Sequence, residues 1–557
     1  RRALVGLVAA LGAMGVSAQL PPAATPGGAL PALPNTPTPQ FLEDGAFPIP
    51  PSPERPMRDE DGDRIFVQEF AIEGVSDRPE HGVSIEDLVE LLENTRINSQ
   101  GLDKVGSDGF AEDERKEVVE FFQRVVSLRE FDDFLYEDYN DLVTRLREER
   151  FSRRSGLTIV QLQRVADQVT AYYRSKGFIL AQAFIPAQDV EGGRVEIEVV
   201  EGRLGNVLAQ GNEKYDLEVL AEPFDELIDS PVTNAGIEEA ILTLVTDKGI
   251  QTYRPYPGLR MSAVFRPGTE VGTSDLVLGV REEKPIDVAL QIDNNGSRFT
   301  GERRVQAEFY WNNPLGVGDR VDLQLTQNYL PKGNLFYSAG YNIPVPGHPS
   351  SWFEFSAGKQ MFTVGADQKA LGISGETNTL GASFYHTAFA NRFHEMVLRT
   401  GLERQDAITK RFKTVVNEDN ISNLFFGFGY ERKDAVNTGF DTVDLQFSQG
   451  LDGNFGGMAK SVVPTRAIKP GRQGNKGNFA SNDWYTLRGR YRRVQSIDPD
   501  HLLIARVEGQ WSNALLPGTQ QMSLGGPDSV RAYPVSEFLR DTAVFASLEW
   551  FWRAPGF

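Results

Sequence analysis

Side chains with the chemistry of catalysts or metal ligands are few and scattered in this sequence. Its 557 residues include no cysteine, which excludes thiol catalysis and cysteine-ligated metal sites. No Gly-x-Ser-x-Gly element and no serine, histidine and aspartate order stands out. The histidines show no metal-ligand spacing; they lie at positions 81, 348, 386, 394 and 501. The residue types therefore predict neither an enzyme nor a bound metal or cofactor.

Two short segments have the composition of an ion or phosphate site. Asp293-Asn294-Asn295-Gly296 carries oxygens that could bind calcium, but these residues are also typical of a β-turn, which we favour. GLDGNFGG, residues 450–457, is glycine-rich like a nucleotide-binding loop. It lacks the preceding strand and following helix that such a loop requires, so a flexible external loop fits it better. No nucleotide partner is expected.

The most specific polar segment is SLGGPDSVRAYPVSEF, residues 523–538. It lies between two strand-like runs and places an arginine among glycines, prolines and polar residues. Its candidate functional residues are Gly525, Gly526, Val530, Arg531 and Tyr533. A strand pattern does not need so long a connection, so the loop has to be understood from the elements around it.

The elements around this loop have the two-residue period of β-strands. About twelve strand-like segments recur from residue 285 to the end of the chain. In RVDLQLTQN, for example, Val321, Leu323 and Leu325 alternate with polar residues. In the last strands the polar positions are charged, as expected for residues that line a water-filled pore; they are Arg488, Arg490, Arg492, Arg506, Glu508 and Glu549.

The connections between these segments alternate between tight turns and long loops. The expected long connections are residues 361–378, 406–422, 451–482 and 512–541. Long loops on one rim and tight turns on the other are typical of an outer-membrane β-barrel. A soluble periplasmic binding or adhesion protein would have a similar composition but would not need this alternation.

Two smaller units with mixed periodicity precede the strands. Residues 64–201 read as strand, helix, helix, strand and strand, with Ser84 as a helix N-cap. The helix near residues 157–178 places Leu162, Val165 and Val169 on one face. Residues 202–284 repeat a similar order in shorter form, so the sequence predicts two α+β modules in tandem.

The N-terminal residues and the overall charge limit the compartment and the partners. Residues 1–18 have the basic start, apolar segment and small-residue cleavage site of a secretory signal peptide. Residues 19–63 are proline-rich and predict an extended tether. The mean hydropathy of −0.34 argues against a helical membrane protein, and the net charge of −20 against nucleic acid as a main partner.

Three stretches, in a fixed order, resemble the two-partner secretion transporters (TpsB; the ShlB/FhaC/HecB haemolysin secretion/activation proteins), relatives of the barrel-assembly protein BamA. Residues 172–202, YYRSKGFILAQAFIPAQDVEGGRVEIEVVEG, are similar to the signature of the first POTRA (polypeptide-transport-associated) domain. Residues 266–283, RPGTEVGTSDLVLGVREE, resemble the end of the second POTRA domain. Residues 523–533, SLGGPDSVRAY, resemble the family's conserved loop, usually written VRGY.

The resemblance implies α+β periplasmic POTRA modules followed by a transmembrane antiparallel β-barrel. We assign a signal peptide (1–18), a proline-rich tether or plug-linker region (19–63), POTRA 1 (64–201, with an insertion at about 99–153), POTRA 2 (202–284) and the barrel (285–557). The family barrel has sixteen strands with the conserved loop between the eleventh and twelfth, so we expect the barrel to be incomplete at its C-terminal end. The loop also departs from the family at Ala532, where the family has glycine.

The implied function is that of an outer-membrane pore in a Gram-negative bacterium. Its POTRA domains would recognise a secreted haemolysin, adhesin or contact-inhibition toxin in the periplasm, and the barrel would translocate it to the cell surface. Strand addition to a sheet edge is the expected binding mode, with Leu162, Tyr173, Phe184 and Ile185 as candidate contacts and core packing as the alternative for each. Arg531 would fold back into the pore and pair with a carboxylate, for which Glu508 and Glu549 are the candidates.

Two other barrel functions remain open on these residues. A BamA- or TamA-like insertase would share the fold, although it usually has more POTRA modules. A ligand-gated uptake porin would need no POTRA module. In every case lipids of the outer membrane are partners of the barrel.

Overall fold

The computed structural model describes residues 64–557 with several gaps. The residues outside the description are 101, 103–104, 106–109, 111, 128–139, 148–155, 191, 245–255, 283, 330–332, 392, 435–437, 460–470, 476, 532 and 554–557. The predicted signal peptide (1–18) and tether (19–63) also lie outside the described residues.

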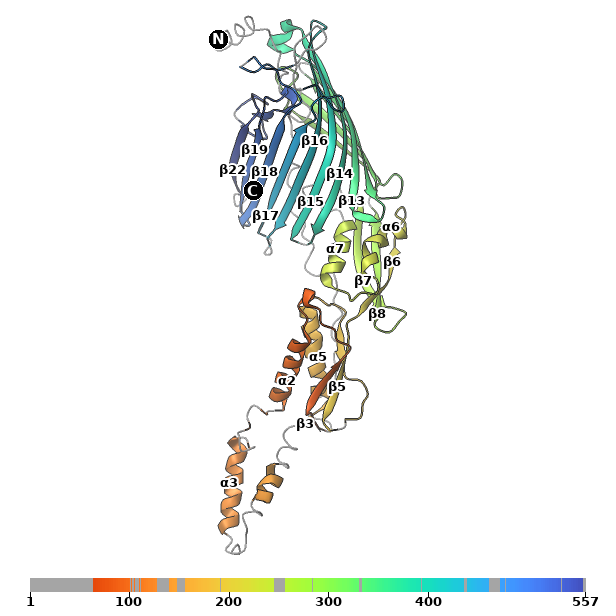
Figure 1. The fold of residues 1–557 in the computed structure, drawn as a ribbon, viewed down its shortest axis with the longest axis vertical. Helices are drawn as coiled ribbons and strands as arrows, with labels where there is room; N and C mark the ends of the chain where they lie inside the picture. The colour runs from red at the N-terminus through yellow and green to blue at the C-terminus, as the bar shows by residue number, and fades with distance from the viewer. Residues whose placement is uncertain are drawn as a thin grey trace.

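A large antiparallel sheet of twelve strands forms the C-terminal half (Figure 1). Each strand pairs with its neighbours in the chain, so that β9 and β22 are the edge strands of the described sheet. The strands are β9 (Ile286–Asp293), β10 (Arg303–Asn312), β11 (Arg320–Tyr329), β12 (Asn334–Val345), β13 (His348–Thr363), β14 (Ile373–Ala390), β15 (His394–Arg411), β16 (Thr414–Lys433), β17 (Gly439–Gly450), β18 (Tyr485–Asp498), β19 (His501–Ser512) and β22 (Ala543–Trp552).

The register of these strands separates two faces, which we name the apolar face and the polar face. Phe309 lies opposite both Val288 and Leu323, and all three side chains belong to the apolar face. On this face, no other described element covers the Leu290 side chain, which is 70% exposed. Arg490 lies opposite both Asp444 and Glu508 on the polar face. The alternation predicted from the sequence is thus confirmed for these strands.

Two of the expected long connections are wrong. Half of the segment 361–378 is strand, because β13 runs to Thr363 and β14 begins at Ile373 after the short helix η5 (Ala366–Leu371). The segment 406–422 is a strand pair in which only Phe412 and Lys413 make the turn. Both segments are rich in glycine or polar residues and looked like loops. Backbone pairing, however, needs a neighbouring strand and not an apolar side chain.

The first N-terminal module packs helices on one side of a small sheet. β2 (Glu69–Glu73) pairs in parallel with β5 (Arg194–Val200), which pairs antiparallel with β4 (Gln182–Phe184). α2 (Ile85–Ser99) and α5 (Ile159–Ser175) share a buried core with this sheet. The Ser84 side chain accepts hydrogen bonds from the amides of Glu86 and Asp87, so the predicted N-cap is confirmed.

A charged helical segment extends away from this core. α3 (Glu112–Ser127) lies at the far end of the molecule in Figure 1, beyond α2 and α5. β3 (Gly156–Leu157), where the segment rejoins the module, pairs with β1 (Ile65–Phe66). The side chain of Gln100, where the segment leaves α2, hydrogen-bonds to the backbone of Val67, next to β1. The insertion therefore begins and ends next to each other on the module surface.

The second module repeats the strand topology of the first. β6 (Arg203–Gln210) is parallel to β8 (Thr273–Glu282), which is antiparallel to β7 (Leu259–Pro267). α6 (Leu217–Ala221), η4 (Glu222–Leu227) and α7 (Asn234–Leu244) cover this sheet. The central strand in each module is the last one in the chain, which supports the internal repeat read from the sequence pattern.

The second module is fastened to the turn end of the large sheet (Figure 1). The amide of Tyr256 donates to the carbonyl of Gly318 in the turn before β11, at 3.2 Å. The Glu222 carboxylate accepts from the amide of Gly347 in the turn before β13. Because Tyr256 is fully buried, this contact joins the module core directly to the sheet.

None of the described helices is long and apolar enough to cross a membrane.

Candidate functional site: the polar face and its arginine loop

The arginine loop is closed at its base by a short hairpin. β20 (Met522–Leu524) pairs antiparallel with β21 (Phe538–Arg540), so residues 525–537 form the loop. Gly525 has a φ of +113° and Gly526 a φ of +100°, conformations that residues with a side chain rarely adopt. A Cβ on Gly525 would lie 2.3 Å from the carbonyl oxygen of Pro534. The two glycines of the motif are therefore required by the backbone of the turn.

Polar contacts within the loop fix its shape. The amide of Gly525 donates to the Ser529 hydroxyl at 2.7 Å, and the amide of Gly526 to the carbonyl of Tyr533 at 3.0 Å. The ring of Tyr533 packs edge-on against Phe538, with 5.3 Å between ring centroids. Val530 contributes the carbonyl that accepts from the Tyr533 amide. Ala532, the departure from the family motif, lies outside the described residues.

Arg531 contacts a strand of the polar face. Its Nη2 atom lies 2.8 Å from Oε2 of Glu549 on β22. The arginine side chain is 64% exposed and the glutamate 18%. Of the two carboxylates that were candidates, Glu549 holds the arginine, while Glu508 lies 4.0 Å from Arg490.

The charged residues expected to line a pore all lie on the polar face. Arg490 on β18 lies between Asp444 on β17, at 3.9 Å, and Glu508 on β19. Asp444 also pairs with Arg399 on β15, at 2.7 Å. Arg492 and Arg506 face each other in the register of β18 and β19. From Arg399 through Asp444 and Arg490 to Glu508 the strands bring opposite charges together, whereas Arg492 and Arg506 are like charges.

Parts of the long connections cover the polar face at the loop end of the sheet. Arg488 donates to the carbonyl of Gln520 at 3.0 Å and also contacts Gln510. The Gln520 side chain donates to Gln405 on β15, at 3.2 Å. Asp541 accepts from the Leu516 amide at 3.2 Å and pairs with Arg472.

Sequence reasoning missed these covering contacts. They join residues far apart in the chain, such as Gln405 and Gln520, and no local pattern signals them. They hold segments of the long connections against the polar face at the loop end of the sheet.

The candidate partner-binding residues of the first module are divided by their burial. Leu162 is 3% exposed and Tyr173 is fully buried, both inside the module core. As partner contacts these two are wrong, because an apolar helix face packed on its own sheet offers no surface. Phe184 and Ile185 are half-buried at the end of β4 and remain proposals.

The second module offers a longer sheet edge than the first. β7 has nine residues and pairs only with β8, whereas the edge strand β4 has three. The exposed Val264 lies in the middle of β7. β7 is therefore a better edge than β4 for an added strand.

Two side chains of the modules, Tyr173 and Asp275, have pKa values shifted by their surroundings. Burial raises the pKa of the Tyr173 hydroxyl, an effect to which the nearby Glu201 carboxylate adds. The backbone amide of Asn206, 2.9 Å from the carboxylate of Asp275, lowers the pKa of that carboxyl, and Arg266 contributes in the same direction. Asp275 therefore fastens β8 to β6 while it is ionised.

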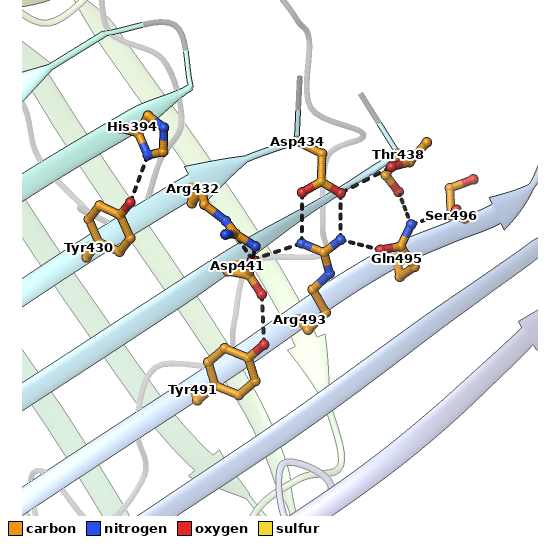
Figure 2. A network of polar contacts seen from close by, with 10 residues as sticks. All are labelled: His394, Tyr430, Arg432, Asp434, Thr438, Asp441, Tyr491, Arg493, Gln495 and Ser496. Carbon is orange, nitrogen blue, oxygen red and sulfur yellow. Dashed lines mark hydrogen bonds and ion pairs between the residues drawn. The ribbon is translucent and has the colours of Figure 1, made fainter. Parts of the chain in front are cut away.

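The apolar face carries its own polar network at the turn end, drawn in Figure 2. Arg493 on β18 lies 2.5 Å from Asp434 and 2.9 Å from Asp441. Asp441 on β17 also binds Arg432 on β16, at 2.8 Å, and accepts from the Tyr491 hydroxyl at 2.8 Å. Charged groups and tyrosine hydroxyls at this height suit a membrane–water interface.

No arrangement of ligands in the described residues indicates a metal. Among these residues no group of three or more histidine, aspartate or glutamate side chains is placed to hold one. In the segment considered for calcium, the Asp293 carboxylate accepts from the Asn295 amide at 2.8 Å and pairs with Arg304. The carboxylate thus closes a turn, as the favoured interpretation expected.

Family models match two parts of the chain. The model described as haemolysin secretion/activation protein ShlB/FhaC/HecB matches residues 272–553, which is more than half of the sequence. The model of the ShlB-type POTRA domain matches residues 149–202.

Two curated proteins of similar sequence carry the word transporter in their names. The chain is 23% identical over 389 residues to the heme/hemopexin transporter protein HuxB of Haemophilus influenzae, a match covering 68% of the chain and 63% of HuxB. It is 25% identical over 389 residues to the outer membrane transporter CdiB of Escherichia coli, covering 68% of the chain and 60% of CdiB. The chain thus spans less than two thirds of the length of these relatives.

The solved structure of CdiB from Escherichia coli superposes with a TM-score of 0.59 at 18% identity. The match covers 91% of the chain and 78% of that structure. At this identity the likeness establishes the fold alone.

Proposed function

The chain belongs to the haemolysin secretion/activation protein family ShlB/FhaC/HecB, and we propose that it is an outer-membrane transporter of two-partner secretion. In this proposal the POTRA modules receive an unfolded exoprotein in the periplasm. The barrel then conducts it to the cell surface. No catalytic residue is required, since folding of the exoprotein outside can supply the driving force.

The observation that carries the proposal is the polar face with the arginine loop on it. Charges of both signs alternate along one wall, from Arg399 through Asp444 and Arg490 to Glu508. Such a wall stays hydrated and offers no long apolar surface on which an unfolded chain would stick. The ion pair between Arg531 and Glu549 attaches the loop to this same polar face.

The modules lie where a periplasmic chain would be received. The second module joins the turn end of the sheet through Tyr256 and Glu222, at the end opposite the arginine loop. The free edge of β7 would accept an extended segment of the exoprotein through backbone hydrogen bonds. Phe184 and Ile185 on the first module would extend the contact to side chains.

The test is export of an exoprotein by the full-length protein. We would co-express it with a large candidate exoprotein from the same bacterium, and measure exoprotein in the medium and transporter in the outer-membrane fraction. The expected result is export that stops when the exoprotein's N-terminal domain is deleted. A transporter that reaches the outer membrane but exports no such exoprotein would contradict the proposal. Loss of unrelated outer-membrane proteins on depletion would instead favour an insertase.

A further inference from the structure

The apolar face is hollowed in one place near the middle of the sheet. The hollow has a volume of about 740 Å³ and crosses from β11 to β16. Its wall is apolar and includes Tyr341, Phe355, Leu380 and Leu402. These side chains belong to the apolar face, which lies on the opposite side of the sheet from the arginine loop.

Small residues placed side by side cause the hollow. Ala339 lies opposite Ala357 in the register of β12 and β13, and Ala382 lies opposite Phe355 in that of β13 and β14. Larger side chains, among them Leu380, surround these alanines. Neighbouring strands are about 4.8 Å apart, so a hollow across six strands is roughly 24 Å long. An extended hydrocarbon chain has this shape.

A charged cluster lies beside the hollow, on the side toward the loop end of the sheet. Lys359 follows Ala357 by two residues on β13, toward the long-loop end, and its Nζ lies 2.9 Å from the Glu376 carboxylate. Lys410 binds the same carboxylate at 3.0 Å. Arg404, which lines the hollow, pairs with Asp406 at 2.7 Å. Lys359 and Lys410 thus share the single carboxylate of Glu376, while Glu418, opposite Ile408 in the register of β15 and β16, lies on the same face.

The two ends of the apolar face differ in the number of carboxylates that pair with their cations. At the turn end, Arg432 and Arg493 are balanced by Asp434 and Asp441 (Figure 2). At the loop end the lysines are each about a third exposed, at 31% for Lys359 and 36% for Lys410. An anion could therefore reach Lys359 and Lys410 and replace part of their contact with the Glu376 carboxylate.

We propose that this hollow binds an acyl chain of a phosphorylated glycolipid of the outer leaflet, whose phosphate lies on Lys359 and Lys410. The inference rests on the proposed function only in that the apolar face contacts the outer membrane. A hydrocarbon chain in the hollow leaves its contact with mobile lipid and packs against Phe355 and Leu380. The exposed Phe455, whose carbonyl accepts from Arg404, lies where aromatic rings mark a membrane interface.

The experiment measures lipid retention by the full-length protein. The protein is purified in a non-ionic detergent and titrated with diphosphoryl lipid A, and bound lipid is counted by native mass spectrometry. The wild type should retain one lipid A per chain and bind phosphatidylglycerol more weakly. Ala357→Phe, which fills the hollow, should weaken lipid A retention about tenfold or more. Lys359→Gln combined with Lys410→Gln should lower retention of lipid A but not of its dephosphorylated form.

The matched control is Ala307→Phe, the same substitution on the apolar face of β10 outside the hollow. It should leave lipid A retention unchanged, and all variants should show the wild-type unfolding temperature. Equal retention by Ala357→Phe and Ala307→Phe would overturn the inference, as would phosphatidylglycerol that binds as tightly as lipid A. A dimer that only Ala357→Phe dissociates would assign the hollow to a second copy instead. Retention is read without an exoprotein, so a failure of export leaves this result standing.

Discussion

The guanidinium of Arg531 and the carboxylate of Glu549 lie 2.8 Å apart, joining the loop to the polar face of β22. This pair is the direct side-chain link by which the tip of the described loop reaches the sheet wall. Because the arginine is more than half exposed, the pair positions the loop but contributes at most about 1 kcal/mol to stability.

Arg531→Ala and Glu549→Gln should each release the loop without unfolding the sheet. We expect a changed single-channel conductance in planar bilayers and reduced export, with an unfolding temperature within about 2 °C of the wild type. The exchanged pair Arg531→Glu with Glu549→Arg should restore part of the wild-type conductance. If the two single variants conduct as the wild type does, the pair does not hold the loop.

Gly525→Ala should distort the base of the loop. The substitution places a Cβ 2.3 Å from the Pro534 carbonyl at a φ of +113°, which costs on the order of 1–3 kcal/mol locally. Protease cleavage between β20 and β21 should become faster. Gly518→Ala is the matched control, since a Cβ at Gly518 meets no atom within 4 Å. Equal cleavage of the two variants would show that the loop base tolerates the change.

The network of Figure 2 should couple three strands at the turn end of the sheet. Arg493→Gln removes the partner of both Asp434 and Asp441. In a double-mutant cycle with Asp441→Asn, unfolding by urea in detergent should give a coupling of about 0.5–3 kcal/mol, since the groups are in contact. Pairing Arg493→Gln with Glu549→Gln, on the other face, should give a value near zero. A coupling near zero in the first cycle would mean that water screens the network.

The second module should lose stability in acid through Asp275. Its pKa is lowered in the folded state, so the ionised carboxylate stabilises the fold at all pH values above its unfolded pKa of about 3.9. That contribution is lost as the pH falls through the lower folded pKa. Asp275→Asn should therefore reduce hydrogen-exchange protection of β6 and β8 at pH 7, and the difference from wild type should vanish in acid. Asp216→Asn, an exposed carboxylate without a capping bond, is the control.

The strands and their faces could be predicted because the information is local. Residues such as Val321, Leu323 and Leu325 alternate with polar neighbours, and a strand with one apolar face fixes that side by its period alone. The Ser84 cap and the glycines of the arginine loop were local signals in the same sense. The face of Arg490, Glu508 and Glu549 also followed from counting residues.

Partners and exposure were decided only by the tertiary structure. The sequence placed Leu162 and Tyr173 on a helix face that could have contacted a partner. Packing of α5 on the sheet buries both residues instead. The polar segments 361–378 and 406–422 became strands because a neighbouring strand was available. The two-residue period of the strands places Glu508 and Glu549 on the same face. Only the position of the folded loop therefore decides that Arg531 pairs with Glu549. An alternating sequence determines which way each side chain points, whereas the distance between two such side chains depends on how the whole chain is folded.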